Sequence, residues 1–152
     1  MRRVCLLKAA LIAVLLSGCR EKPTAVEDIG ATEITFPNST KIMAETMRRK
    51  EDLERGMMFR EALPAGRGML FVYRSEANLA YWMYQTKIPL DIIWMDRRHR
   101  IVEISANTPP CPSKSPKDCP AYGGHEKAQF VLEVNAGVAA KDHLRVGDVL
   151  DF

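Results

Sequence analysis

Short apolar runs separated by polar links dominate the chain from residue 31 onward. Most of these runs are too short for a helix, and several alternate apolar with polar positions, as half-buried strands do. The pattern predicts strands over Ala31–Phe36, Thr40–Met47, Gly68–Tyr73, Leu79–Tyr84, Leu90–Met95, Ile101–Ser105, Ala128–Asn135 and Val149–Phe152. Because the turn Pro37-Asn38-Ser39 separates the first two runs, they are predicted to form a hairpin.

The apolar period changes to that of a helix between Lys50 and Arg60. Three residues fall on one side at helical spacing, and acidic residues fill the first turn, where the helix dipole favours negative charge. The apolar residues are Leu53, Met57 and Met58, and the acidic ones are Glu51, Asp52 and Glu54. We therefore expect one short helix that ends before Pro64. Gly137–His143 could add a single helical turn.

These elements predict a mainly β fold, a compact antiparallel β-sandwich or barrel with one short helix. Neighbouring strand positions are often both apolar, which indicates that the sheet is buried on two sides. The expected core comprises Leu70, Val72, Ile92, Trp94, Val102, Ile104, Val131 and Leu132. At 152 residues the chain is long enough for one domain with a substantial core.

The first residues have the pattern of a cleaved export signal. Three positive charges, on Arg2, Arg3 and Lys8, precede or enter an apolar run that continues to Leu16 and is too short to span a bilayer permanently. The run ends in Leu16-Ser17-Gly18-Cys19, which resembles the lipobox of bacterial lipoproteins. This resemblance implies a signal peptide over 1–18, a lipidated Cys19 with a tether over 19–30, and a folded domain over 31–152.

The acyl chains on Cys19 are therefore expected to anchor the protein to the membrane, since several such chains give stable anchoring. In lipoproteins an Asp after the lipidated Cys often marks retention in the inner membrane, whereas this chain has Arg20. We expect an exported protein on the periplasmic face of the outer membrane. An uncleaved signal anchor is the alternative.

Removal of the signal changes the charge balance of the chain. The whole sequence has 22 Lys and Arg residues against 19 Asp and Glu, and three of the positive residues lie in the signal. The mature protein is therefore neutral, with 19 of each, which argues against nucleic-acid binding.

Two cysteines, Cys111 and Cys119, remain in the folded domain and flank the polar segment Pro-Ser-Lys-Ser-Pro-Lys-Asp. An exported protein meets an oxidising compartment, so we expect a disulfide that closes this small loop. A reactive thiol pair and a soft metal clip are the alternatives.

Several blocks of the chain, in order, resemble the family DUF192, also called UPF0127. They are Arg55–Arg60, Gly68–Val72, Trp82-Met83 with Thr86, Pro89–Ile93, Val131–Glu133 with Asn135–Gly137, and Gly147-Asp148. The resemblance implies a small, mainly β domain, often exported, of no established biochemical function. The chain departs from the family pattern in Gly56-Met57-Met58, where Gly-Leu-Met is usual, and in Gln85-Thr86, where Asn-Thr is usual.

Polar side chains within these blocks suggest a binding site. Asp91 and Glu133 each lie between apolar strand residues, so burial of either carboxylate would require a partner, for which Arg60 is the natural candidate. Such a pair could simply lock the helix onto the sheet. The functional hypothesis is a small polar ligand, a carboxylate or a carbohydrate, bound against Trp82. Its expected residues are Arg60, Trp82, Met83, Thr86, Asp91 and Glu133.

Two other functions remain as alternatives. Asp91 and Glu133 could act together in a hydrolase if their carboxyl groups shared one cleft. The seven methionines outside the signal could handle copper, although flexible core packing is their ordinary role. The three histidines have no spacing typical of zinc ligands, and no phosphate-binding loop or nucleophile elbow is present in the sequence. We therefore expect no resident cofactor or metal and no catalytic residue, and we lean towards a binding module.

Overall fold

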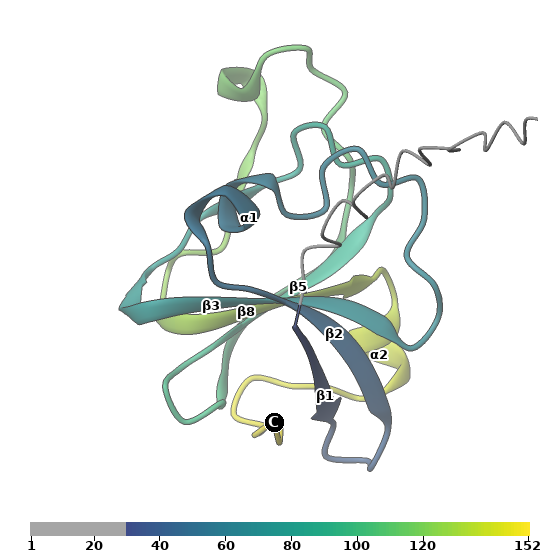
Figure 1. The fold of residues 1–152 in the computed structure, drawn as a ribbon, viewed down its shortest axis with the longest axis vertical. Helices are drawn as coiled ribbons and strands as arrows, with labels where there is room; N and C mark the ends of the chain where they lie inside the picture. The colour runs from purple at the N-terminus through teal and green to yellow at the C-terminus, as the bar shows by residue number, and fades with distance from the viewer. Residues whose placement is uncertain (1–29) are drawn as a thin grey trace, which may run out of the picture.

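The computed structural model describes residues 30–152. The predicted signal peptide, Cys19 and most of the tether lie outside the described residues. Within them, six strands form one sheet (Figure 1) in the order β1-β2-β3-β8-β5-β6. Their bounds are β1 Ala31–Thr35, β2 Lys41–Met47, β3 Arg67–Asn78, β8 Lys127–Asn135, β5 Leu90–Met95 and β6 Ile101–Thr108.

The other elements are short. Helix α1 spans Lys50–Arg55, α2 spans Val138–Lys141, and a 3-10 turn, η1, spans Pro116–Asp118. Strands β4 (Tyr81–Trp82) and β7 (Ala121–Tyr122) form a separate two-stranded sheet. The mainly β fold with short helices is therefore confirmed.

The predicted hairpin of β1 and β2 is present, with Ile34 opposite Ile42. The sheet is nevertheless mixed, because β2 and β3 run parallel while the other neighbours run antiparallel. The connection 48–66 between β2 and β3 contains α1 and is long enough for the crossover that a parallel pair needs. The sheet is antiparallel, as predicted, except at this pair.

The run Leu79–Tyr84 does not form the full strand predicted to follow Gly68–Tyr73, because only Tyr81–Trp82 is a strand. Strand β3 extends through the predicted link to Asn78, and it pairs with β2 over 67–71 on one side and with β8 on the other. The shortened strand β4 pairs instead with β7, with Tyr81 opposite Tyr122. This pairing brings the loop after β4 close to the disulfide segment.

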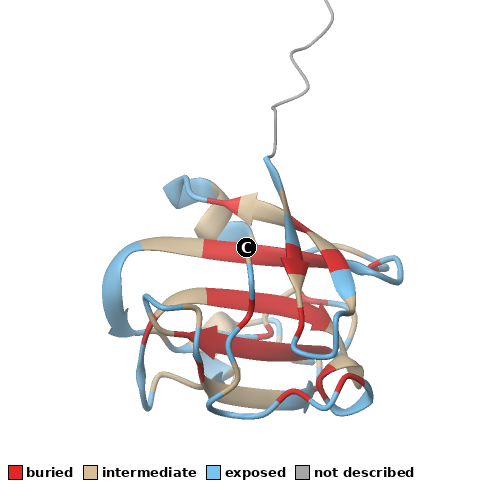
Figure 2. Cartoon of the chain, turned by 90° about the horizontal axis from the view of Figure 1, so that it is seen from below, coloured by how far each residue is buried: buried red, intermediate tan, exposed pale blue. Residues whose placement is uncertain are grey.

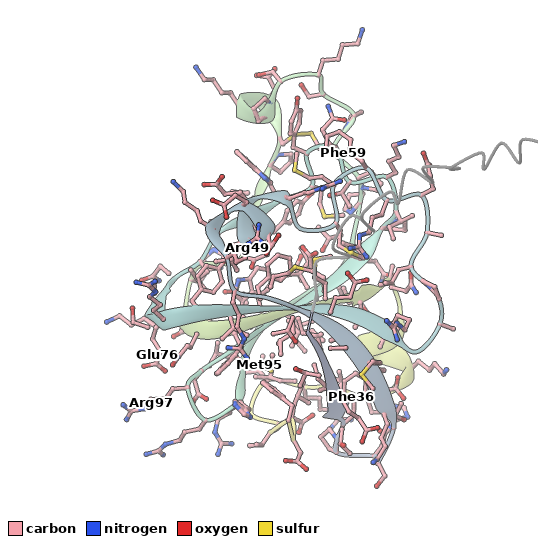
Figure 3. The ribbon with its side chains drawn as sticks, in the orientation of Figure 1. Phe36, Arg49, Phe59, Glu76, Met95 and Arg97 are labelled. Atoms are coloured by element: carbon pink, nitrogen blue, oxygen red, sulfur yellow. A yellow bond between two sulfur atoms is a disulfide. The ribbon has the colours of Figure 1, made fainter. Side chains whose placement is uncertain are left out.

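Apolar side chains cover both faces of the sheet, as predicted. All six residues of β5 are buried, and the apolar ones from Ile92 to Met95 alternate between two clusters. Ile93 and Met95 belong to the cluster that includes Phe36, whereas Ile92 and Trp94 belong to the cluster beneath α1. Figure 3 shows Phe36 and Met95 on one side of the sheet and Phe59, near α1, on the other. Of the predicted core, only Val72, Val102 and Ile104 are partly exposed.

The C-terminal segment approaches both edges of the sheet. Asp151 forms an antiparallel bridge with Thr35 next to β1, and Val149 forms one with Arg100 next to β6. Within residues 30–152, β1 and β6 do not pair directly, so the sheet is curled but not a closed barrel. Figure 2 shows the resulting burial, with buried positions in the strands and exposed ones mainly in the connections and strand ends.

The expected disulfide joins Cys111 and Cys119 with an S–S distance of 2.08 Å. It closes the segment that projects at the top of Figure 1, on the same side of the sheet as α1. The backbone N–H of Cys111 donates to the carbonyl of Met83 at 3.2 Å, which ties this segment to the loop after β4. None of the helices between residues 30 and 152 has the length and apolar character needed to cross a membrane.

Candidate functional site

The end of α1 is fixed by a glycine that no other residue can replace without strain. Gly56 has φ 46° and ψ −133°, a conformation that L-residues avoid, and its N–H donates to the Asp52 carbonyl at 2.9 Å. A Cβ at this position would lie 3.1 Å from Cζ of Phe71 and 4.0 Å from Oε2 of Glu133. The helix therefore ends earlier than predicted, and the bare backbone of Gly56 leaves space beside Glu133.

Glu133 lies on β8 beneath this turn and is only 5% exposed. Its Oε2 atom is buried and has no hydrogen-bond partner within residues 30–152. Burial raises the pKa of Glu133 from 4.5 to about 8, while the nearby charge of Arg60 acts in the opposite direction. The carboxyl group is therefore mostly protonated at neutral pH.

A small cavity of about 40 Å³ lies at the carboxyl group of Glu133. Its walls come from α1 and the following turn, from β3, and from β4 and the loop that follows it. The lining residues are Leu53, Glu54, Arg55, Gly56, Met57, Met58, Phe71, Tyr81, Trp82, Thr86 and Glu133. We call this cavity the Glu133 chamber.

Two wider hollows adjoin the Glu133 chamber. The first, of about 330 Å³, shares Arg55, Gly56 and Met58 with the chamber and is also lined by Phe59 and Arg60. The second, of about 270 Å³, shares four residues with the chamber, namely Leu53, Glu54, Tyr81 and Trp82. The two hollows share no lining residue with each other, so they are separate spaces.

The partner of Arg60 is Glu45 on β2, and not Asp91 or Glu133 as the sequence suggested. The guanidinium donates to both carboxylate oxygens of Glu45, at 2.6 and 2.7 Å. This pairing lowers the pKa of the Glu45 carboxyl. Arg60 thus links the segment after α1 to the sheet and lines the first hollow rather than the chamber.

Asp91 is fully buried, but both of its oxygens already accept hydrogen bonds from the backbone. The N–H groups of Asn107 and Ala139 each donate to it at 2.7 Å. Asp91 is opposite Val134 in the sheet register, whereas Glu133 is opposite Ile92, and successive strand residues face opposite sides. Asp91 and Glu133 therefore lie on opposite faces and do not share a cleft. Asp91 instead clamps β6 and α2 to β5.

Strand β4 and the loop after it contribute two of the three residues predicted there. Trp82 is 50% exposed and lines both the chamber and the second hollow, and Thr86 is buried in the chamber wall. Met83 is fully buried in the core beneath α1 and lines none of the three spaces. The backbone N–H of Phe59 donates to the Gln85 carbonyl at 2.8 Å, which holds this loop against the turn after α1.

Several aromatic residues at the site were not predicted. The hydroxyl groups of Tyr73 and Tyr81 are 2.9 Å apart, and burial raises the pKa of both. The ring of Tyr81 meets that of Phe71 edge to face, with the centroids 5.3 Å apart. In the sequence these rings look like ordinary core residues of apolar runs, and the signal that could have indicated a close approach here is Gly56, within the family-like blocks.

The copper-handling alternative depends on where the methionine sulfur atoms lie. No group of three or more His, Cys, Asp or Glu side chains within residues 30–152 is arranged to hold a metal ion. Four methionines, Met47, Met57, Met69 and Met83, are buried together in the core beneath α1. There they fill space next to Phe71 and Trp94, the usual role of this flexible side chain.

The chain is similar to solved structures of bacterial proteins. One is a protein of unknown function from Novosphingobium aromaticivorans, with 27% identity and a TM-score of 0.68, over 84% of this chain and 89% of that one. Another is described as a "putative transcription regulator" from Sinorhizobium meliloti, with 25% identity and a TM-score of 0.68, over 78% of this chain and 89% of that one. No curated protein matches the chain significantly.

The family comparison covers nearly the whole described domain. Residues 33–152 match the model of DUF192, described as Uncharacterized ACR, COG1430. The match includes every residue that lines the Glu133 chamber. This chain therefore belongs to the DUF192 family.

Proposed function

We propose that this protein is a lipid-anchored module of the bacterial envelope that binds a small polar ligand in the Glu133 chamber without catalysing a reaction. The anchor is proposed from Leu16-Ser17-Gly18-Cys19 directly after an apolar run. Metabolic labelling with a radioactive fatty acid tests it: the native chain should incorporate label and a Cys19→Ala variant should not. Equal labelling of the two chains would rule out Cys19 as the lipid site.

One observation carries the proposal of ligand binding. Oε2 of Glu133 is a buried polar atom without a partner, next to a cavity that adjoins two wider hollows. An unpaired buried polar group costs about 1–3 kcal/mol, so a ligand that supplies the missing hydrogen bond recovers that free energy. Aromatic surface beside a few polar groups is the usual composition of a small-molecule site.

Binding is favoured over hydrolysis because of where the two carboxyl groups lie. The hydrolase hypothesis required Asp91 and Glu133 in one cleft, yet they are on opposite faces of the sheet and both Asp91 oxygens are engaged. Glu133 alone offers no second carboxylate for paired acid and base chemistry.

A thermal-shift screen of the purified full chain tests the binding proposal. Sugars, amines, amides and carboxylates should include compounds that raise the unfolding midpoint, because binding to the folded state stabilises it by about 2.7 kcal/mol at a hundredfold excess over Kd. A Glu133→Gln variant should lose this response, whereas Glu33→Gln, on the exposed side of β1, should keep it. If Glu133→Gln responds as the native chain does, the Glu133 chamber is not the binding site.

A further inference from the structure

We propose that the group entering the Glu133 chamber is the primary ammonium head of a small organic amine, which forms an ion pair with Glu133. This inference rests on the proposed function, because it names the class of ligand that the same site would take. Three features of the chamber support it: its size, the chemistry of its walls, and the balance of charge around it.

The size of the chamber excludes a bulky head group. A water-sized probe occupies roughly 10–15 Å³, so about 40 Å³ provides room for three or four non-hydrogen atoms. An ammonium with its two adjoining methylene groups fits this space. A sugar ring with its substituents does not fit and could reach Glu133 only through a single projecting group.

The walls suit a cation. Rings of Phe71, Tyr81 and Trp82 line the chamber together with the thioethers of Met57 and Met58. Aromatic surfaces attract ammonium groups through their quadrupoles, and this attraction grows when the cation is shielded from water. A carboxylate at the base of such walls supplies the countercharge that a buried cation requires.

The surrounding charges leave Glu133 available. Arg60 is the cation that acts on Glu133, but its guanidinium is committed to both oxygens of Glu45. Glu54 and Arg55 also line the chamber and carry opposite charges. Tyr73 and Tyr81 face Glu133 from β3 and β4, and because burial raises the pKa of each they stay neutral. Glu54 is exposed and lies 3.8 Å from the ammonium of Lys50, so Glu133 is the buried, unpaired carboxyl group that can form the ion pair inside the chamber.

The rest of the ligand has a place outside the chamber. The second hollow, of about 270 Å³, continues from the chamber and is lined by Tyr73, Ala80 and the half-exposed Trp82. A short apolar or hydroxylated chain attached to the ammonium would lie against these residues. Trp82→Leu should therefore weaken binding of longer amines more than that of ethanolamine.

Binding of an ammonium must release a proton from the protein. Free Glu133 holds its proton up to a pH of about 8, because burial raises its pKa, and the ion pair requires the carboxylate. The affinity should therefore rise about tenfold per pH unit from mildly acidic conditions and level off above the pKa of Glu133. A neutral alcohol that hydrogen-bonds to the protonated carboxyl would release no proton.

The test is calorimetric titration of the full chain with ethanolamine, using ethylene glycol as the neutral isostere and glucose as the sugar. Millimolar concentrations are needed, because a ligand of about four non-hydrogen atoms has limited binding energy. We expect ethanolamine alone to bind, with release of one proton when buffers of different ionisation heat are compared, and we expect Glu133→Gln to abolish binding. Glu33→Gln serves as the matched control.

Two outcomes overturn the inference, and they can be told apart. If ethylene glycol or glucose binds in a Glu133-dependent manner and ethanolamine does not, the ligand class is wrong while the proposed binding function stands. If none of the three binds and the thermal-shift screen shows no Glu133-dependent response, both proposals fail. Vesicles of phosphatidylethanolamine, compared with phosphatidylglycerol, distinguish a lipid head group from a soluble amine as the source of the same ammonium chemistry.

Discussion

The burial of Glu133 should make the protein less stable as the pH rises. Burial raises the pKa of this carboxyl from 4.5 to about 8, so the folded state holds a proton that the unfolded state has already lost between these pH values. The stabilisation is complete below about pH 4.5 and is lost as the pH rises to about 8. At 1.36 kcal/mol per pKa unit, the full difference corresponds to about 5 kcal/mol. Total stabilities of single domains are about 5–15 kcal/mol, so the effect should be large.

Urea unfolding of the native chain and of Glu133→Gln, at mildly acidic and mildly alkaline pH, measures the contribution of Glu133 to the free energy of unfolding. Fluorescence can follow the transition, because Trp94 is fully buried and becomes exposed on unfolding. Gln keeps nearly the same shape but does not ionise, so the difference between the two chains removes the contributions of all other titrating groups. This difference should grow by several kcal/mol with pH, in favour of Glu133→Gln. A difference that stays constant would refute the assignment of Glu133 as a buried, unpartnered carboxyl group.

Three further sets of substitutions test how the site and the sheet that carries it are held together. Gly56→Ala should destabilise the fold by about 1–3 kcal/mol or more, because it adds a close contact to a backbone conformation that L-residues avoid. Gly66→Ala is the matched control: Gly66 also has a positive φ but has open space around it, so this substitution should cost less. In urea unfolding, an equal loss for the two would contradict the role of close packing. Arg60→Met and Glu45→Gln, measured singly and together, should show a coupling of about 1–3 kcal/mol, and additive effects would mean that their bidentate pair contributes nothing. Asp91→Ala should cost about 2–6 kcal/mol, because it leaves two backbone N–H groups without their acceptor, and an unchanged urea midpoint would exclude the clamp.

Local patterns predicted most of the strands well. The run Leu90–Met95, which is apolar except for Asp91, is the observed β5, because a strand buried on both faces is apolar at neighbouring positions. The disulfide was predictable from the loop between Cys111 and Cys119. The helix was predicted five residues too long at Arg60, because the spacing of Met57 and Met58 continues the apolar side past the backbone turn at Gly56.

Contacts between distant segments were not predictable in the same way. The parallel pairing of β2 and β3 depends on the path of the connection 48–66, which local periodicity does not contain. Arg60 pairs with Glu45 across two elements, and many other carboxylates in the sequence were equally plausible partners. Asp91 bonds to the backbone N–H groups of Asn107 and Ala139, which carry no side-chain signal. The sequence could therefore indicate that Glu133 and Asp91 are buried, but not which of them keeps an unpaired oxygen.

Carbon-13 NMR can directly observe the protonation of the Glu133 carboxyl group, around which the proposed binding site is built. Its side-chain carboxyl signal should titrate with a midpoint near pH 8 in the free protein, as burial of the group dictates. The signal should also move when the compound that most raises the unfolding midpoint is added. A midpoint near 4.5, with no response to any compound that stabilises the protein, would contradict both the unpartnered carboxyl and the binding site built around it.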